Sequence, residues 1–108
     1  TIVSQLLKDG MMRGVDIPQL ESFDAGMLFA RTEGIIPAPE SCHAIAATVR
    51  EAVRCREAGE KKTILFCLSG HGLIDMTSYD RYIDGDLQNY SIADEDIEKN
   101  TADLLHVE

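Results

Sequence analysis

The residues best suited to bind a ligand are Ser69-Gly70-His71-Gly72, which directly follow five apolar residues at 64–68. Two glycines let the backbone turn sharply and approach another molecule closely. In open α/β sheets, ligands bind just beyond the carboxyl ends of the strands. Ser69 would be the first polar side chain at such an end, so it is a candidate ligand contact. An ordinary strand-to-loop turn with a capping serine explains this run equally well.

A second candidate is the run E-G-I-I-P-A-P-E-S, which extends from Glu33 to Ser41. Its two prolines favour a stiff, extended backbone, and its two isoleucines indicate that the segment is buried. A buried irregular segment must satisfy its own backbone groups, which favours a functional role. A rigid linker between two helices is the alternative interpretation.

Cys42, His43 and His71 have side chains that could bind a metal ion. Adjacent residues of a helix point about 100° apart, however, so Cys42 and His43 make poor co-ligands. We therefore predict no metal site. The three cysteines form no C-x-x-C pair, and their odd number favours reduced thiols in a cytoplasmic protein.

The composition limits the possible partners. The chain has 108 residues, enough for one domain but not two. It carries 19 acidic and 10 basic side chains, a formal charge of -9. Nucleic acid and anionic membranes both need a basic face, so neither is expected as a partner. No apolar run approaches the ~20 residues of a membrane-spanning helix.

The spacing of apolar residues predicts the elements that position the two candidate runs. Intervals of three and four predict helices over 18–31 and 40–58, ended by glycines at 34 and 59. Shorter helices are expected before Gly10 and before Gly85. The run 63–68 is apolar on both parities, which predicts a strand buried on both faces. The expected fold class is α/β, with several helices around one clear strand.

A single strand cannot satisfy its own N–H and C=O groups. It must pair with 12–17, with another chain, or with sequence beyond this piece. Because the chain also starts at Thr1 without a methionine, we expect a fragment of a longer protein. An open strand edge beside uncovered apolar helix faces predicts a homo-oligomer.

Three segments together resemble the C-terminal part of tryptophan synthase β chains. They are L-F-A-R-T-E-G-I-I-P-A at 28–38, P-E-S-C-H-A at 39–44 and L-F-C-L-S-G-H-G at 65–72. They are most similar to the second, divergent type found in archaea and some bacteria, since the familiar type has E-G-I-I-P-A-L-E-S and S-G-R-G-D-K-D. The resemblance covers residues 1–85 of a single partial domain, 1–108, and the acidic residues 86–108 are expected to form a helical tail.

The resemblance implies the type II fold of pyridoxal-phosphate enzymes and a β-replacement that joins L-serine to indole, giving tryptophan and water. Ser69 matches the family serine whose hydroxyl meets the pyridine nitrogen of the cofactor, and Gly70 would keep the turn beneath it narrow. Glu33 matches the glutamate beside the ring, followed by Gly34. A neutral hydroxyl does not force the ring nitrogen to be protonated, which suits β-elimination and replacement.

Three parts of the family's machinery are missing, one of which is the catalytic glutamate of the N-terminal half of the family's chains. The Schiff-base lysine of the family lies in an H-K or H-x-x-K context, which none of Lys8, Lys61, Lys62 and Lys99 has. The G-G-G-S-N phosphate loop is also missing. We therefore expect no catalytic residue in this chain, and weak or no cofactor binding by it alone. Activity should require the N-terminal part of the parent chain. Whether an α subunit is also needed stays open. The alternatives are a non-catalytic interaction module and a small α/β domain that binds another ligand at the glycine run.

Overall fold

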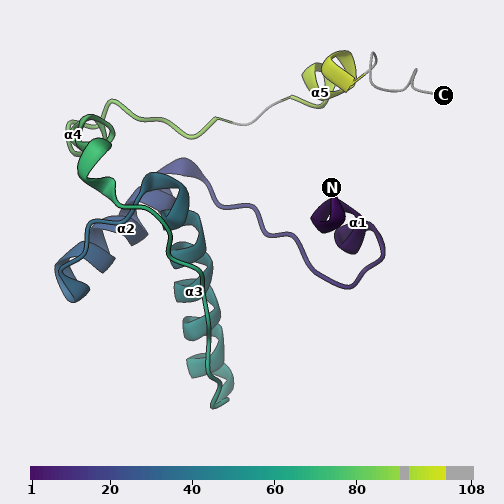
Figure 1. Cartoon of the computed structure of the whole chain (residues 1–108), viewed down its shortest axis with the longest axis horizontal. Coiled ribbons are helices and arrows are strands. Elements are labelled where there is room, and N and C mark those ends of the chain that lie inside the picture. The colour runs from purple at the N-terminus through teal and green to yellow at the C-terminus, as the bar shows by residue number, and fades with distance from the viewer. Residues whose placement is uncertain (91–92, 102–108) are drawn as a thin grey trace.

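Two helices, α2 (Gln19–Glu33) and α3 (Pro39–Ala58), pack against each other at the centre of the computed structural model, which describes residues 1–90 and 93–101 (Figure 1). The remaining elements are α1 (Ile2–Lys8), the 3-10 helix η1 (Gly72–Ile74), α4 (Met76–Ile83) and α5 (Asp94–Thr101). The radius of gyration is 16.9 Å, whereas a compact chain of this length would have about 13 Å. The difference arises because α1 and α5 lie apart from the other helices (Figure 1).

The predicted helices are confirmed, and local signals set their ends. Gly34 and Gly59 end α2 and α3 in the left-handed conformation, with φ of 71° and 67°, which glycine adopts without steric cost. Pro18 at the start of α2 provides no side-chain cap. The Leu20 amide instead donates to the Asn89 side-chain oxygen at 2.9 Å. A residue far along the chain therefore caps α2.

The expected strand at 63–68 is wrong, and with it the expectation of one clear strand among the helices. Residues 60–69 form an extended segment that runs back along α3 (Figure 1), and neither they nor 13–18 belong to a strand. A strand requires a backbone partner, and no second extended segment pairs with this one in the described parts of the chain. Burial on both faces is also wrong, because Leu65 is 94% exposed. The described fold is a set of helices with extended connections.

The helices enclose two small apolar clusters. The first contains Ile17, Ala25, Ile45 and Ala46, with Phe29 and Phe66 packed against it. Phe29 and Phe66 meet edge to face, with their ring centroids 6.1 Å apart. The side chain of Phe66 therefore fastens the extended segment to α2 and α3.

The second cluster joins α2, α3 and α4 through Phe23, Cys42 and Tyr79. The phenol ring of Tyr79 meets the ring of Phe23 edge to face, at a centroid distance of 5.3 Å. At Gly26, a Cβ atom would lie 2.5 Å from the Cys42 sulfur. Only glycine therefore lets α2 approach α3 this closely.

Three ion pairs support α3 from the outside. Arg50 pairs with Glu21 of α2, and Arg54 pairs with Glu51 at 2.6 Å and with Glu60 at 3.2 Å. The hydrogen bond from Arg54 lowers the pKa of the Glu51 carboxyl to about 2. None of the helices described has the length and apolarity that crossing a bilayer requires.

Candidate functional site

The turn Ser69–Gly72 is docked onto the segment that leads into α3. The amide of Gly72 donates to the carbonyl oxygen of Ile36 at 2.9 Å. The Ser41 hydroxyl donates to the Ser69 carbonyl oxygen at 2.8 Å and accepts from the Ser69 amide at 3.4 Å. The structure therefore brings together the two runs that the sequence singled out, E-G-I-I-P-A-P-E-S and S-G-H-G.

Glycine is required where these two runs touch. A Cβ atom at Gly72 would lie 2.5 Å from the carbonyl oxygen of Pro37 and 2.6 Å from a methyl group of Ile36. Gly70 has φ +68°, and a Cβ atom there would lie 3.4 Å from the Cβ of Ala38. The absence of side chains at both glycines lets the turn approach the proline-containing segment.

A cavity of about 440 Å³ opens beside this turn. Most of its lining is small or polar and comes from the turn, the start of α3 and the end of η1: Ala38, Glu40, Ser41, Ser69, Gly70, His71, Ile74 and Asp75. Two of these side chains are carboxylates, and neither lysine nor arginine lines the cavity. The cavity therefore suits a neutral or cationic group better than an anion.

His71 has a local structural role in this turn. Its Nδ1 atom accepts a hydrogen bond from the Leu73 amide at 3.3 Å, which caps η1. This contact requires an unprotonated Nδ1, so the proton of the neutral ring lies on Nε2. The imidazole is thereby held at the edge of the cavity.

Tyr79 anchors the proline-containing segment from below. Its hydroxyl donates to the Pro37 carbonyl oxygen at 2.5 Å and lies 3.3 Å from the Cys42 sulfur. The Cys42 thiol also donates to the Ala38 carbonyl oxygen at 3.4 Å. Burial raises the pKa of both the Cys42 thiol and the Tyr79 hydroxyl, so both groups stay protonated in the folded chain at neutral pH.

Glu33 and Gly34 lie at the other end of the same run. Glu33 is the last residue of α2 and is exposed, and Gly34 ends the helix by donating its amide to the Ala30 carbonyl oxygen at 3.0 Å. Glu33 lines a cavity of about 230 Å³ with Phe29 and Phe66. Ser69 and Gly70 line the 440 Å³ cavity instead, and Gly34 lines neither cavity. The structure therefore does not bring the four predicted cofactor residues together in one cavity.

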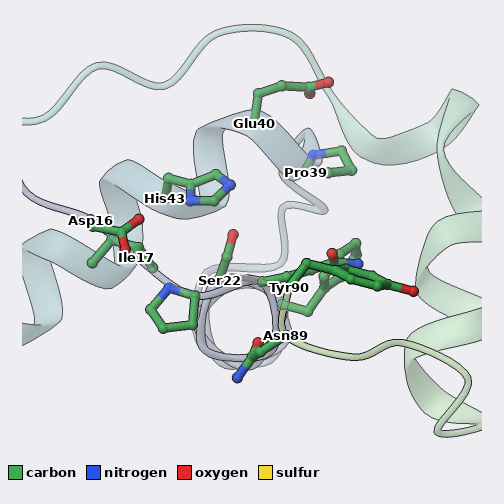
Figure 2. A pocket seen from close by; sticks show the side chains of 11 residues that line it. Asp16, Ile17, Ser22, Pro39, Glu40, His43, Asn89 and Tyr90 are labelled. Carbon is green, nitrogen blue, oxygen red and sulfur yellow. The ribbon is translucent and has the colours of Figure 1, made fainter. Parts of the chain in front are cut away.

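A larger cavity, of about 620 Å³, lies where α2 and α3 begin (Figure 2). Ser22 from α2 and Glu40 and His43 from α3 line it, together with Asn89 and Tyr90 from the segment after α4. Its residues form no arrangement of nucleophile and base. We assign it no chemistry.

The sequence analysis missed Ser41 and Tyr79 as residues that shape the site. A serine in the first turn of a helix is normally interpreted as part of a cap, and nothing local indicates a bond to Ser69. Tyr79 was expected only on one side of a short helix. Its position among apolar residues of α4 was the available signal that its hydroxyl must find a buried partner.

Sequence comparisons show which proteins this chain resembles. No family model matches the chain. The chain is 56% identical over 86 residues, 80% of its length, to tryptophan synthase beta chain 2 of Methanosarcina acetivorans. It is 52% identical over 86 residues to the chain of the same name in Aquifex aeolicus, and 46% identical over 92 residues to that of Pyrococcus furiosus.

The chain thus matches one part of an amino-acid-synthesising enzyme chain, covering 20–21% of the length of these curated relatives. That part is the C-terminal part of tryptophan synthase β chains of the second type. The resemblance inferred from the motifs is therefore confirmed.

Proposed function

We propose that this chain forms the C-terminal part of a tryptophan synthase β chain and supplies one wall of its pyridoxal-phosphate site. The observation that carries the proposal is how Ser69 is hydrogen-bonded. Its main-chain groups are held by Ser41, while its side chain lines the 440 Å³ cavity. None of the described residues hydrogen-bonds to the Ser69 hydroxyl, so it is free to meet a ligand.

The residues fit one end of the cofactor. The carboxylates of Glu40 and Asp75, without a nearby cation in the lining, would repel a phosphate. A pyridine ring carries no phosphate charge and meets less repulsion in the same place. We therefore propose that Ser69 meets the ring nitrogen, with Gly70 beneath it. The phosphate end is bound by residues outside this chain, in agreement with its lack of a glycine-rich phosphate loop.

When bound, pyridoxal phosphate withdraws electrons from the amino-acid substrate and so permits replacement of the serine hydroxyl by indole. The task of this chain is to offer an uncharged hydroxyl at a fixed position. Because Ser69 carries no charge, it can hydrogen-bond to the ring nitrogen without forcing a proton onto it. Glu33 and Gly34 are proposed to lie beside the ring, which requires the end of α2 to approach it in the longer chain.

The isolated chain is expected to make no tryptophan, because it contains no lysine in the family's context. Incubation with pyridoxal phosphate, L-serine and indole should give no more product than the free cofactor does. The longer β chain that carries this sequence should be active in the same assay. Tryptophan formed by the isolated chain above the free-cofactor rate would contradict the proposal.

The matched variant is Ser69→Ala in the longer chain. Loss of one hydrogen bond to a reacting ring should lower turnover roughly ten- to a hundredfold. Ser22→Ala, which removes a buried serine hydroxyl from α2, is the control and should leave turnover unchanged. If Ser69→Ala is as active as the control, the role of Ser69 is wrong.

We also propose that the isolated chain forms a homo-oligomer. Leu65 is 94% exposed, and the main chain of 61–68 makes no hydrogen bond to any other described residue. An open edge of this kind pairs readily with a second copy. Burial at ~25 cal/mol per Å² favours association once an interface exceeds ~1,000 Å². The charge of -9 opposes it, but ~0.15 M salt screens that repulsion beyond ~8 Å.

Sedimentation equilibrium at micromolar concentration should therefore detect a dimer or a larger species. The variant Leu65→Lys places a charge on the open edge and should shift the equilibrium toward the monomer. A monomer for the original chain would show that this edge does not pair. The cytoplasmic location expected from the cysteines stays a prediction.

A further inference from the structure

Ser41 makes an unusual contact for a helical serine. It lies in the first turn of α3 and is 8% exposed. Its hydroxyl donates to the Ser69 carbonyl oxygen at 2.8 Å and accepts from the Ser69 amide at 3.4 Å. A serine hydroxyl carries one proton and two lone pairs, so it can satisfy both groups at once. One side chain therefore holds both main-chain polar groups of Ser69.

This contact matters because little else fixes the backbone at Ser69. No β-ladder holds the preceding segment, 60–68, within the described residues. The following residue, Gly70, has φ +68°, a region that glycine enters and leaves easily. The next main-chain anchor is the bond from Gly72 to Ile36. The direction of the Ser69 side chain therefore depends on Ser41.

We infer that Ser41 is a positioning residue for the cofactor, which aims the Ser69 hydroxyl at the ring nitrogen by holding the Ser69 backbone. The inference rests on the proposed function of Ser69. Ser41 lines the same cavity as Ser69, but its single proton is engaged by the Ser69 carbonyl oxygen. It therefore acts through Ser69 and not as a donor to the ligand.

The test uses Ser41→Ala, Ser69→Ala and Ser22→Ala in the longer β chain, titrated with pyridoxal phosphate. Ser41→Ala is expected to weaken cofactor binding two- to tenfold, the effect of losing one hydrogen bond. It should also shift the absorption of the bound cofactor, as a function of pH, in the same direction as Ser69→Ala. Ser22 is a buried serine on the neighbouring helix, and its alanine variant should change neither quantity.

A second measurement isolates the contact itself. Amide hydrogen exchange at Ser69, followed by NMR in the 108-residue chain, should be faster in Ser41→Ala than in Ser22→Ala, because the amide has lost its acceptor. This readout needs no cofactor. Equal exchange in the two variants would overturn the positioning role of Ser41.

The two proposals fail in different ways. If Ser69→Ala weakens binding and shifts the absorption while Ser41→Ala does neither, the inference about Ser41 is wrong and the proposed function stands. If Ser69→Ala changes neither quantity, the proposed contact of Ser69 with the ring is wrong, and the inference fails with it.

Discussion

Replacing Tyr79 with alanine is expected to lower the free energy of unfolding by about 3–5 kcal/mol, the usual cost of removing a large buried aromatic side chain. Tyr79 is 3% exposed, meets Phe23 edge to face and donates to the Pro37 carbonyl oxygen. It is the main contact between α4 and the proline-containing segment. Urea unfolding followed by circular dichroism measures the change.

Because that variant can prevent folding altogether, Tyr79→Phe is the more informative partner. It keeps the ring but leaves the buried Pro37 carbonyl oxygen without its donor, at a cost of about 1–3 kcal/mol. Tyr90→Phe is the matched control, since Tyr90 is 83% exposed, and it should unfold at the same urea concentration as the original chain. Equal stability of Tyr79→Phe and this control would contradict the role assigned to the hydroxyl.

The same hydroxyl should make the fold sensitive to alkali. Burial raises the folded-state pKa of Tyr79 above its unfolded value. Its contribution to stability is therefore complete below about pH 10, the usual pKa of tyrosine, and is lost as the pH rises further and the unfolded chain alone releases the proton. The loss of unfolding free energy above about pH 10 should be smaller in Tyr79→Phe, which has no hydroxyl to ionise.

Replacing Gly72 with alanine is expected to lower the free energy of unfolding by about 1–3 kcal/mol, the range for overpacking. The new Cβ atom would lie 2.5 Å from the Pro37 carbonyl oxygen and 2.6 Å from Ile36 Cγ2. The nearer contact is backbone, which cannot rotate away. The turn must therefore move, and the hydrogen bond from Gly72 to Ile36 is broken or lengthened.

Gly14→Ala is the control for this substitution. Its new Cβ atom would be 3.7 Å from the nearest atom of Leu7, an ordinary contact distance. The free energies of unfolding of the two variants, measured with urea, should differ by about 1–3 kcal/mol. If Gly72→Ala unfolds together with Gly14→Ala, the turn is not packed as closely against Pro37 as described.

The helices could be predicted because their signals are local. Gly34 and Gly59 end α2 and α3 as expected, and Pro39 begins α3. The extended segment could not be predicted, since a run that is apolar on both parities does not reveal whether anything covers both sides. Leu65 has the character of a core residue and is almost fully exposed.

For the site, motifs identified the two runs, but their contact depends on atoms far apart in the sequence. The hydroxyl of Ser41 reaches the backbone of Ser69 only because the chain turns at Gly59 and then runs back along α3. The spacing of residues along the sequence does not predict this contact. The family resemblance suggested a role for Ser69, whereas only the three-dimensional arrangement shows that Ser41 holds its main chain.

The cap on α2 connects the two ends of the described core. The amide of Leu20 donates to Asn89, so the first turn of α2 gains this partner only when the segment after α4 has folded back to it. A cap that lies next to its helix in sequence forms within the helix–coil timescale. The contact between Leu20 and Asn89 instead requires closure of the long chain segment between them. The order of folding is thereby constrained: α2 and α3 can pair before this cap forms, and the cap must follow the return of the segment after α4.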